Sequence, residues 1–320
     1  MMEIATLTMN PTVDVSLEVD RVVHTHKMRG GNELHAPGGG GINVARVFVR
    51  LGGNARCYYL SGGPMGVALD GLLDLHQLVR TRIPIAGETR ISTTVREKES
   101  GKEFRFLAEG PTVSDSEWQA CLEAVSEARC DYLVASGSLP KGVPDDFFAR
   151  VAAAANGRGI RFVLDTSGTA LAQGLAGGGV FLVKPSLGEF RTLTGRSLPT
   201  EEDIAAAAAA IVSRGEAENV AVTMGLDGAL LVNKAGIQRL PALQVPTASA
   251  VGAGDSFLAA MVHALASGRD AGEAFRFGIA AGAAAVLRPG TDLAAAADIT
   301  RLHAEMTAQV GGHSVSTTGR

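Results

Sequence analysis

The sequence predicts an α/β protein built on a mostly parallel sheet that helices flank, with a small antiparallel β sheet beside it. Three observations support this prediction. Apolar strand-like runs alternate with helical runs along most of the chain, a pattern typical of parallel sheets. The strand-like runs carry few polar residues, as expected for strands covered on both faces. Residues 12–36 and 88–108 instead alternate apolar and polar side chains without a helix signal, which favours antiparallel strands.

Each element is expected where the local composition favours it. Strands are predicted for six runs: EIATLTM (3–9), ARCYYLSGG (55–63), CDYLVASGS (130–138), IRFVLDTSG (160–168), GVFLVKPS (179–186) and ENVAVTMG (218–225). Helices are predicted for five runs: INVARVFVRL (42–51), DSEWQACLEAVSEA (115–128), PDDFFARVAAAANGRG (144–159), EEDIAAAAAAIVSRG (201–215) and GDSFLAAMVHALASG (254–268). The alanine-rich residues 205–210 have high intrinsic helix propensity.

Composition limits the classes of protein that the chain can represent. The 320 residues are 46% hydrophobic and 19% charged, and we expect one domain over 1–310 and a disordered Gly/Ser/Thr-rich tail over 311–320. The net charge of -4 and the 5% of aromatic residues argue against a nucleic-acid partner. Three cysteines without a C-x-x-C pair, and no run long enough to span a membrane, indicate a cytoplasmic protein.

Four consecutive glycines, Gly38–Gly41, directly precede the first predicted helix. Glycine has no Cβ, so main-chain N–H groups can approach a ligand closely. A helix N-terminus adds partial positive charge at the same point. This stretch therefore indicates a site for a polar or anionic small molecule.

Small polar residues follow four of the predicted strands. The stretches are SGSLP, DTSG, KPSLGE and TMGLDG, each at the expected carboxyl end of a strand. Each one alone is typical of a plain turn. Because ligands bind at the carboxyl ends of parallel strands, four such ends in series indicate a cleft.

The most specific stretch is SAVGAGDSF, residues 249–257, where small residues precede an apolar-periodic helix. The N–H groups of Gly252, Ala253 and Gly254 are expected to form an anion hole suited to a phosphoryl group in transfer. Asp255 beside them is either an N-cap or a base that takes a proton from an attacking hydroxyl. We favour the catalytic role, because a cap does not need the preceding glycines.

Other catalytic motifs are absent from the sequence. There is no P-loop, no G-x-S-x-G elbow and no H-E-x-x-H pair, and the G-x-G-x-x-G fingerprint is broken by Asn43. His24 and His26 have no cluster of partner residues that would indicate a metal site. These absences argue against a P-loop NTPase and weaken the case for a nicotinamide oxidoreductase.

The chain resembles the ribokinase-like sugar kinases of the PfkB family in the two motifs PGGGGINVAR and SAVGAGDSF. The similarity extends from Met2 to about residue 308, and the first motif is most similar to that of the 6-phosphofructokinase branch. The resemblance implies a ribokinase-like fold in which segments 12–36 and 88–108 form a lid over the active site. It also implies a homodimer in which two lids pair.

The resemblance implies a sugar-phosphate site and assigns residues to it. Those expected to contact the sugar hydroxyls are Asp14, Gly39, Gly40, Asn43 and Ser138. Those expected to clamp the phosphate are Lys27, Arg29, Arg90 and Arg105. Arginine suits this role because its guanidinium binds phosphate through two parallel hydrogen bonds.

The resemblance also implies ATP, Mg²⁺ and a monovalent cation such as K⁺. Residues expected to bind ATP are Lys184, Ser186, Thr223, Gly225, Gly228 and Ala284, the last within an adenine wall over 280–291. Glu189 is expected to hold Mg²⁺ through water. The expected cation site comprises carbonyls around Ser249 and Val251 and the turn at 285–289. Ser186 departs from the family pattern, which has Asn at this position.

The implied reaction is in-line transfer of the γ-phosphoryl group of MgATP to the primary hydroxyl of a hexose phosphate, with Asp255 as the base. Fructose 6-phosphate is the expected substrate, and fructose 1-phosphate and tagatose 6-phosphate are alternatives. A non-catalytic sugar-phosphate sensor and a nicotinamide oxidoreductase are further alternatives. ADP release separates the sensor from the kinase, and a nicotinamide titration tests the oxidoreductase.

Overall fold

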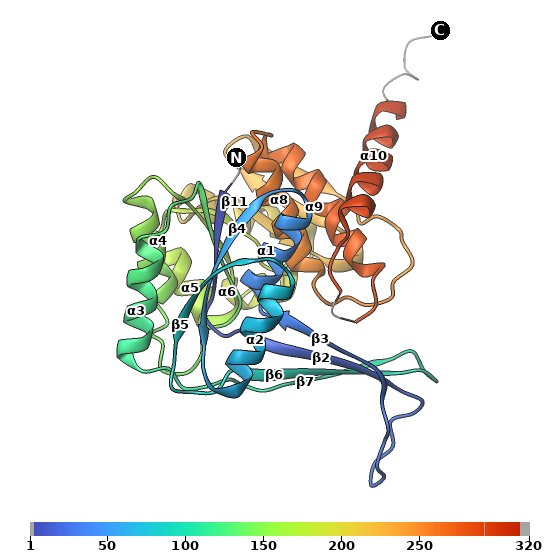
Figure 1. Cartoon of the computed structure of the whole chain (residues 1–320). Coiled ribbons are helices and arrows are strands. Elements are labelled where there is room, and N and C mark those ends of the chain that lie inside the picture. Colours follow the sequence, from blue (N-terminus) through green and yellow to red (C-terminus); the bar gives the residue numbers. More distant parts are fainter. Residues whose placement is uncertain (1–2, 291, 314–320) are drawn as a thin grey trace.

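The main feature of the fold is a nine-stranded sheet in a computed structural model that describes residues 3–290 and 292–313, with side chains described to residue 308 (Figure 1). The strand order is β13-β12-β11-β10-β9-β8-β1-β4-β5. All neighbouring pairs are parallel except β11–β12 and β12–β13. The strands are β1 (Glu3–Thr8), β4 (Asn54–Ser61), β5 (Val79–Pro84), β8 (Tyr132–Ser136), β9 (Arg161–Asp165), β10 (Val180–Val183), β11 (Ala217–Thr223), β12 (Ala229–Asn233) and β13 (Gly236–Leu240).

Helices cover both faces of this sheet, because its strands are apolar on both sides. One face carries α1 (Gly40–Arg50), α2 (Gly63–Leu75), α8 (Ala253–Ala266), α9 (Ala271–Val286) and α10 (Ala296–His313). The other carries α3 (Asp115–Ser126), α4 (Phe147–Asn156), α5 (Gly168–Ala176), α6 (Leu187–Thr194) and α7 (Glu201–Ser213). Each layer packs its own core against the sheet. No helix in the part of the chain that the structure describes is long and apolar enough to cross a membrane.

The predicted α/β class and all six predicted main strands are confirmed, and each of the five predicted helical runs contains a helix. Helix α2 and strands β12 and β13 are not among the predicted elements, because their sequence patterns are weak. Helix α2 contains glycines, and β12 and β13 form a short hairpin at the edge of the sheet. Of the predicted tail over 311–320, residues 311–313 continue α10, and the remainder lies outside the described residues.

The two segments predicted to form a lid make a second, four-stranded sheet, in the order β3-β2-β6-β7, which we name the lid. Its strands are β2 (Thr12–Val19), β3 (Gly31–Gly38), β6 (Arg90–Glu97) and β7 (Glu103–Leu107). Each predicted segment is an antiparallel hairpin, as expected, but the two hairpins join through a parallel β2–β6 pair. The reason is geometric: β2 follows β1 and β6 follows β5, so both leave the same edge of the main sheet in the same direction.

The lid has two chemically different faces. Register pairs Thr12 with Arg90 and Thr94 with Arg105, and side chains alternate between faces along each strand. Asp14, Arg90 and Arg105 therefore share one face. Apolar side chains gather on the other face, among them Val13, Val15, Leu17, Ile91, Val95, Phe104 and Phe106.

Candidate active site

The carboxyl ends of the parallel strands gather polar side chains at one edge of the main sheet. Ser136 ends β8, Asp165 ends β9, Lys184 follows β10 and Thr223 ends β11. The last three line a cleft of about 640 Å³ that α8 and α9 close on its other side. The predicted cleft at this edge is confirmed, since parallel strands bring their carboxyl ends together.

The glycine run explains how α1 approaches this edge. Gly39 is the N-cap of α1 and has a positive φ of 110°, a conformation that favours glycine. A Cβ on Gly40 would lie 2.1 Å from Ser136 Oγ, and one on Gly38 would lie 2.3 Å from Asp14 Oδ2. The glycines are required because backbone packs directly against polar side chains of the strand ends and the lid.

Helix α8 begins at a second glycine. Gly252 is the N-cap in the left-handed conformation, with φ of 73°, and a Cβ there would lie 2.3 Å from Leu293 Cδ2. No side chain caps this helix end within the described residues, and the N–H of Ala253 makes only a long hydrogen bond of 3.5 Å to Ala250 O, so the first N–H groups can turn to an anion. Asp255 is the third residue of the helix, and the N-cap role considered for it is wrong.

Asp255 is a partly buried carboxylate held by a residue of the other glycine motif. Its Oδ2 accepts a hydrogen bond of 2.9 Å from Asn43 Nδ2 of α1. Burial, and then the charge of Asp165, raise the pKa of Asp255 to about 6, against the hydrogen bond from Asn43 and the charge of Lys184. A carboxylate with this pKa is ionised at neutral pH and is a stronger base than ordinary aspartate.

Lys184 lies between this carboxylate and the strand ends. Its Nζ forms a buried ion pair of 3.1 Å with Asp165 Oδ1, and a Cβ on Gly254 would lie 3.2 Å from the same Nζ. Burial lowers the pKa of Lys184, but the charges of Asp165, Asp255 and Glu189 outweigh burial and raise it, so the amine stays charged. Asp165 was not among the predicted site residues, although the strand-end pattern DTSG marked its position.

Ser186 and Glu189 form a capping box at the start of α6. Glu189 Oε2 accepts hydrogen bonds of 2.8 Å from both the N–H and the hydroxyl of Ser186, and Ser186 Oγ accepts from the N–H of Glu189 at 3.3 Å. Serine is a good N-cap, so Ser186 fixes the start of α6 at the position where the resemblance implied asparagine. Thr223 lies beside it, because its N–H donates to Pro185 O at 3.0 Å.

The predicted nucleotide residues divide into two groups. Gly225 and Gly228 line the cleft, and both have positive φ, 61° and 93°. Ala284 does not line it: the side chain is fully buried in the core on the inner side of α9. The α9 residues that line the cleft are Ile279, Gly282, Ala283 and Val286. Ala284 therefore lies on the face of α9 that is turned away from the cleft, which is opposite to the prediction. Thr291 of the predicted wall lies outside the described residues.

The predicted sugar residues meet at the base of the lid. Asp14 is buried against Gly38, and burial raises its pKa to about 6 although Arg105, Arg46 and Arg90 oppose this shift. Arg90 donates to Asn10 O at 2.8 Å and to Ala108 O at 2.9 Å. Ser138 Oγ lies 3.4 Å from Asn10 Nδ2. Asn10 is a polar residue at this site that sequence reasoning missed.

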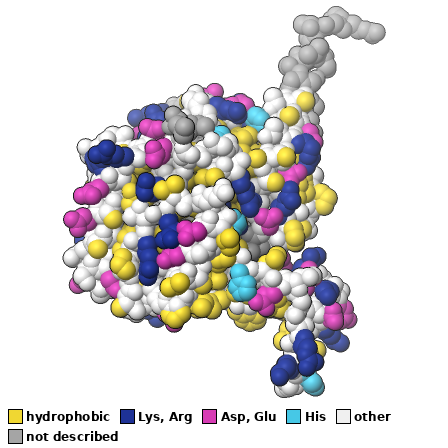
Figure 2. All heavy atoms as spheres, in the orientation of Figure 1, with side chains coloured by type: hydrophobic (Ala, Val, Ile, Leu, Met, Phe, Trp, Pro, Cys, Tyr) yellow, Lys and Arg dark blue, Asp and Glu magenta, His cyan; other side chains and the backbone are white. Residues whose placement is uncertain are grey.

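Lys27 and Arg29 are not brought to this site within the chain. Both are exposed, in the connection between β2 and β3. That connection projects from the free end of the lid, away from the main sheet (Figure 1). Figure 2 shows basic, acidic and histidine side chains gathered at this end.

The two segments predicted to hold a monovalent cation lie together. The N–H of Ala248 donates to Val286 O at 2.7 Å. Ser249 Oγ donates to Glu103 Oε2 of the lid at 3.0 Å and accepts from the N–H of Val251 at 3.2 Å. Glu103 Oε1 is buried without a hydrogen-bond partner among the described residues.

These features define a class of site. A helix start able to bind an anion adjoins a partly buried carboxylate and a buried lysine, between a cleft of about 640 Å³ and a polar lid face. Such an arrangement suits phosphoryl transfer to a hydroxyl group.

Comparisons with known proteins agree with this class. The family model for pfkB family carbohydrate kinase matches residues 7–297. The chain is 41% identical to the ATP-dependent 6-phosphofructokinase isozyme 2 of Mycobacterium tuberculosis, over 93% of this chain and 88% of that protein. It is 36% identical to the Escherichia coli protein of the same name, over 96% of this chain and 100% of that one. It is 31% identical to the 1-phosphofructokinase of Bacillus subtilis, over 88% and 91% of the two chains.

Solved structures give the same result. The Escherichia coli phosphofructokinase-2 in complex with potassium has a TM-score of 0.92, and its complex with fructose-6-phosphate has 0.90. Each is 36% identical and covers 96% of this chain and 100% of that one. The chain belongs to the pfkB family of carbohydrate kinases. It is a phosphotransferase with an alcohol group as acceptor, which confirms the predicted family and enzyme class.

Proposed function

We propose that this chain transfers the γ-phosphoryl group of ATP to the primary hydroxyl of fructose 6-phosphate, forming fructose 1,6-bisphosphate. The observation that carries the proposal is the hydrogen bond of 2.9 Å between Asn43 and Asp255. This hydrogen bond joins Asn43, in the glycine motif assigned to the sugar, to Asp255, the proposed base beside the anion hole. The relatives with the highest identities given above are 6-phosphofructokinases, which favours this substrate over fructose 1-phosphate.

In the proposed mechanism, Asp255 accepts the proton of the attacking hydroxyl. The N–H groups at residues 252–254 and the Lys184 ammonium stabilise negative charge on the transferring group. The polar lid face, with Asp14 and Arg90, orients the sugar phosphate and excludes water, so that ATP is not hydrolysed.

The residues present fit a hydrated Mg²⁺. Asp165 and Glu189 are close enough for their charges to interact, and both line the cleft. Carboxylate oxygens and retained waters are the ligands that Mg²⁺ prefers. When bound, Mg²⁺ offsets charge on the phosphates. Because Glu189 Oε2 is used by the capping box, we assign the water-mediated contact to Oε1.

A monovalent cation also fits the proposed scheme. The loop around Ser249 and Val251 adjoins the end of α9, where main-chain carbonyls can converge. The unpartnered Glu103 Oε1 adds negative charge beside this loop. We propose K⁺, because the relative from Escherichia coli has been solved with potassium.

We further propose a cytoplasmic homodimer with a glycolytic role. Lys27 and Arg29 are exposed at the far end of the lid. They can join the phosphate clamp of a neighbouring copy if two lids pair through their apolar faces. Pairing would also cover exposed lid residues such as Phe106, which is 61% exposed.

An ADP-release assay with MgATP tests the proposal against fructose 6-phosphate, fructose 1-phosphate, tagatose 6-phosphate, fructose and ribose. We expect turnover of fructose 6-phosphate, and loss of at least about 10³-fold in kcat for Asp255→Ala, because removal of a base and loss of its local field combine. Preference for another hexose phosphate would reassign the substrate. Turnover of fructose or ribose alone would contradict the role of Arg90 in binding the phosphate group of the sugar. Binding without turnover of any sugar would indicate the sensor.

A further inference from the structure

Arg46 is a buried cation next to the proposed base, and the mechanism above does not use it. It lies on α1, within the motif PGGGGINVAR, and is only 5% exposed. Its Nη1 donates to Asn43 Oδ1 at 3.2 Å and to Pro37 O at 3.1 Å. Its Nε is buried without a hydrogen-bond partner among the described residues. A buried guanidinium whose Nε–H lacks an acceptor costs folding free energy, so its presence at this position calls for an explanation.

The two neighbours of Asn43 fix the orientation of its amide. Asparagine can turn its amide by half a rotation, which exchanges the carbonyl oxygen and the NH₂ group. Arginine only donates hydrogen bonds, and an ionised carboxylate only accepts them. With Arg46 on one side and Asp255 on the other, only one orientation satisfies both contacts. That orientation directs the Asn43 NH₂ group to Asp255 Oδ2.

We propose that Arg46 is a positioning residue: it holds the Asn43 amide so that the NH₂ group donates to Asp255 and keeps this carboxylate aimed and ionised for proton transfer. This inference rests on the proposed function of Asp255 as the base. Without Arg46, the Asn43 amide can present its oxygen to the carboxylate, and the two oxygens repel each other.

Several charged groups surround Asp255, and they set what a change at Arg46 does. Asp165 at the end of β9 and Asp14 of the lid disfavour its ionised form, whereas Lys184 after β10 and the hydrogen bond from Asn43 favour it. Arg46 also interacts electrostatically with both Asp14 and Asp255. Its loss therefore moves ionisation of Asp255 to higher pH, through the amide and through its charge. Substitutions at Arg46 and Asn43 must be combined to separate the effect through the amide from the effect through the charge.

The test compares the pH dependence of kcat for wild type, Arg46→Met and Arg46→Lys, with fructose 6-phosphate and MgATP saturating. For Arg46→Met we expect kcat at pH 5, below the acidic limb, to fall about tenfold, the size of one lost hydrogen bond to a charged group. The acidic limb should move up by about one pH unit, which is the same free energy. Arg46→Lys keeps a donor and the charge, and should recover part of both changes. The KM for ATP should stay unchanged.

A double-mutant cycle identifies the path. In an Asn43→Ala background, Arg46→Met should move the acidic limb little further, because the residue through which it acts is gone. An equal shift in both backgrounds would mean that Arg46 acts through its charge alone, and would overturn the proposal. So would an unchanged acidic limb in Arg46→Met. Arg161→Gln is the control for a general effect of losing an arginine on stability. Arg161 begins β9, at the opposite end of the strand from the site.

An activity-independent readout separates this inference from the proposed function. Carboxyl ¹³C NMR of aspartate-labelled protein gives the titration of Asp255, assigned by difference from Asp255→Asn. The Asp255 signal should titrate at higher pH in Arg46→Met than in wild type. If wild type turns over no sugar phosphate but this shift is seen, the proposed function fails and the positioning role stands. If wild type is active and the titration does not move, the positioning role fails.

Discussion

At the scale of single residues, the site is organised around buried charge. Lys184 is buried and Asp165 and Asp255 are partly buried where the sheet meets α8, and an ion pair of 3.1 Å joins Lys184 to Asp165. Charges in such a place stabilise a transition state strongly because water does not screen them. The same burial makes each of them costly in the absence of substrate. These charges therefore lower the free energy of unfolding of the protein, and the effect can be measured.

Asp255→Asn should stabilise the protein while abolishing activity. The pKa of Asp255 rises from the ordinary 3.8 to about 6 in the folded chain. The folded state therefore holds the proton more tightly than the unfolded state, and wild type loses stability as the pH rises from about 4 to about 6. Above pH 6 the loss amounts to about 3 kcal/mol. Asparagine does not titrate, so the variant should not show this loss.

Thermal unfolding of wild type and Asp255→Asn at pH 5 and pH 8 measures this difference. The variant should gain more in melting temperature at pH 8 than at pH 5. Asp227→Asn, which replaces an exposed carboxylate after β11, is the matched control and gives the baseline for the comparison. An equal gain at both pH values would show that ionisation of Asp255 is not the source.

Some residues of the site could be predicted from the sequence, and others could not. Asp255, Asn43 and Lys184 lie in local motifs whose neighbours reveal their setting. Asp165 and Arg46 acquire their setting only through residues that are distant in the chain or one helical turn away. Ala284 was assigned to the cleft because small residues occur on both faces of α9, so composition did not indicate which face is inside.

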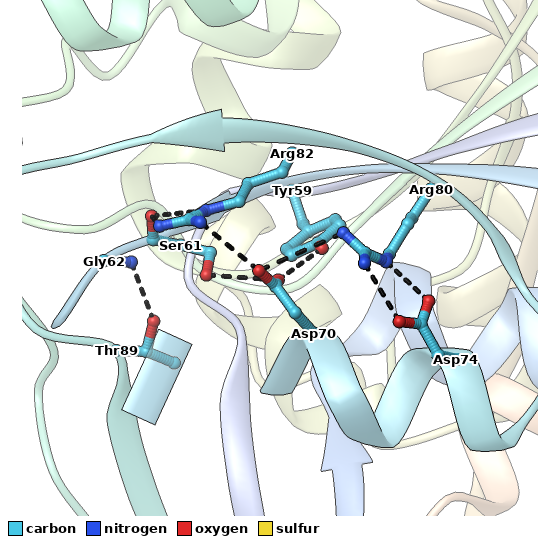
Figure 3. A network of polar contacts seen from close by, with 8 residues as sticks. All are labelled: Tyr59, Ser61, Gly62, Asp70, Asp74, Arg80, Arg82 and Thr89. Atoms are coloured by element: carbon cyan, nitrogen blue, oxygen red, sulfur yellow. Dashed lines mark hydrogen bonds and ion pairs between the residues drawn. The ribbon is translucent and has the colours of Figure 1, made fainter. Parts of the chain in front are cut away.

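At the scale of elements, a polar network attaches α2 to the edge of the main sheet (Figure 3). Asp70 of α2 accepts a hydrogen bond of 2.6 Å from the hydroxyl of Tyr59 on β4. Its other oxygen lies 3.4 Å from Arg82 Nη1 and 4.0 Å from Arg80 Nη1 on β5. Burial raises the pKa of Tyr59, so its hydroxyl stays a donor. Beside this network, the N–H of Gly62 donates to Thr89 Oγ1 at 3.1 Å, one residue before the lid strand β6.

Loss of Asp70 should therefore weaken this attachment much more than loss of its neighbour. The Asp70 side chain is 13% exposed, whereas Asp74, which forms a bidentate pair with Arg80, is 58% exposed. Asp70→Ala leaves the Tyr59 O–H donor without its acceptor and should cost about 2–3 kcal/mol. Asp74→Ala removes only a solvent-screened surface pair and should cost much less. Urea unfolding measures both, and equal costs would contradict the structural role assigned to Asp70.

Elements themselves were predictable wherever their signal was local. The capping boxes that begin α3 and α7, Ser114 with Glu117 and Thr200 with Asp203, fix helix starts within four residues of sequence. The parallel pairing of β2 with β6 was not predictable in this way. Some seventy residues separate the two strands, and their relative direction depends on where β1 and β5 end. Strand pairing across that distance leaves no periodicity in the sequence.

At the scale of the whole molecule, the lid is the part that a single chain leaves incomplete. One face lies toward the site, where Glu103 bonds to Ser249 and Asp14 is buried. The other face exposes apolar side chains, with Ile91 40% and Phe106 61% exposed. A sheet with an uncovered apolar face favours association. The charged residues Lys27 and Arg29 lie beyond that face, in the exposed connection between β2 and β3.

Phe106→Asp should therefore separate the proposed dimer and weaken sugar-phosphate binding together. A charge on the apolar face at the edge strand β7 cannot be buried against a second lid without a partner. Analytical ultracentrifugation should show dimers for wild type and monomers for the variant. The KM for fructose 6-phosphate should rise as it would for Lys27→Ala, because both changes remove the same cation from the clamp.

Leu75→Asp is the matched control, because Leu75 is 80% exposed at the end of α2 and lies outside the lid. It should leave both the dimer and the KM unchanged. If Phe106→Asp is monomeric and its KM is that of wild type, the two lids pair but Lys27 and Arg29 do not serve the neighbouring site. If wild type is itself a monomer at assay concentrations and fully active, the apolar lid face has another role and the clamp must close within one chain. The two measurements thus test association and shared catalysis separately.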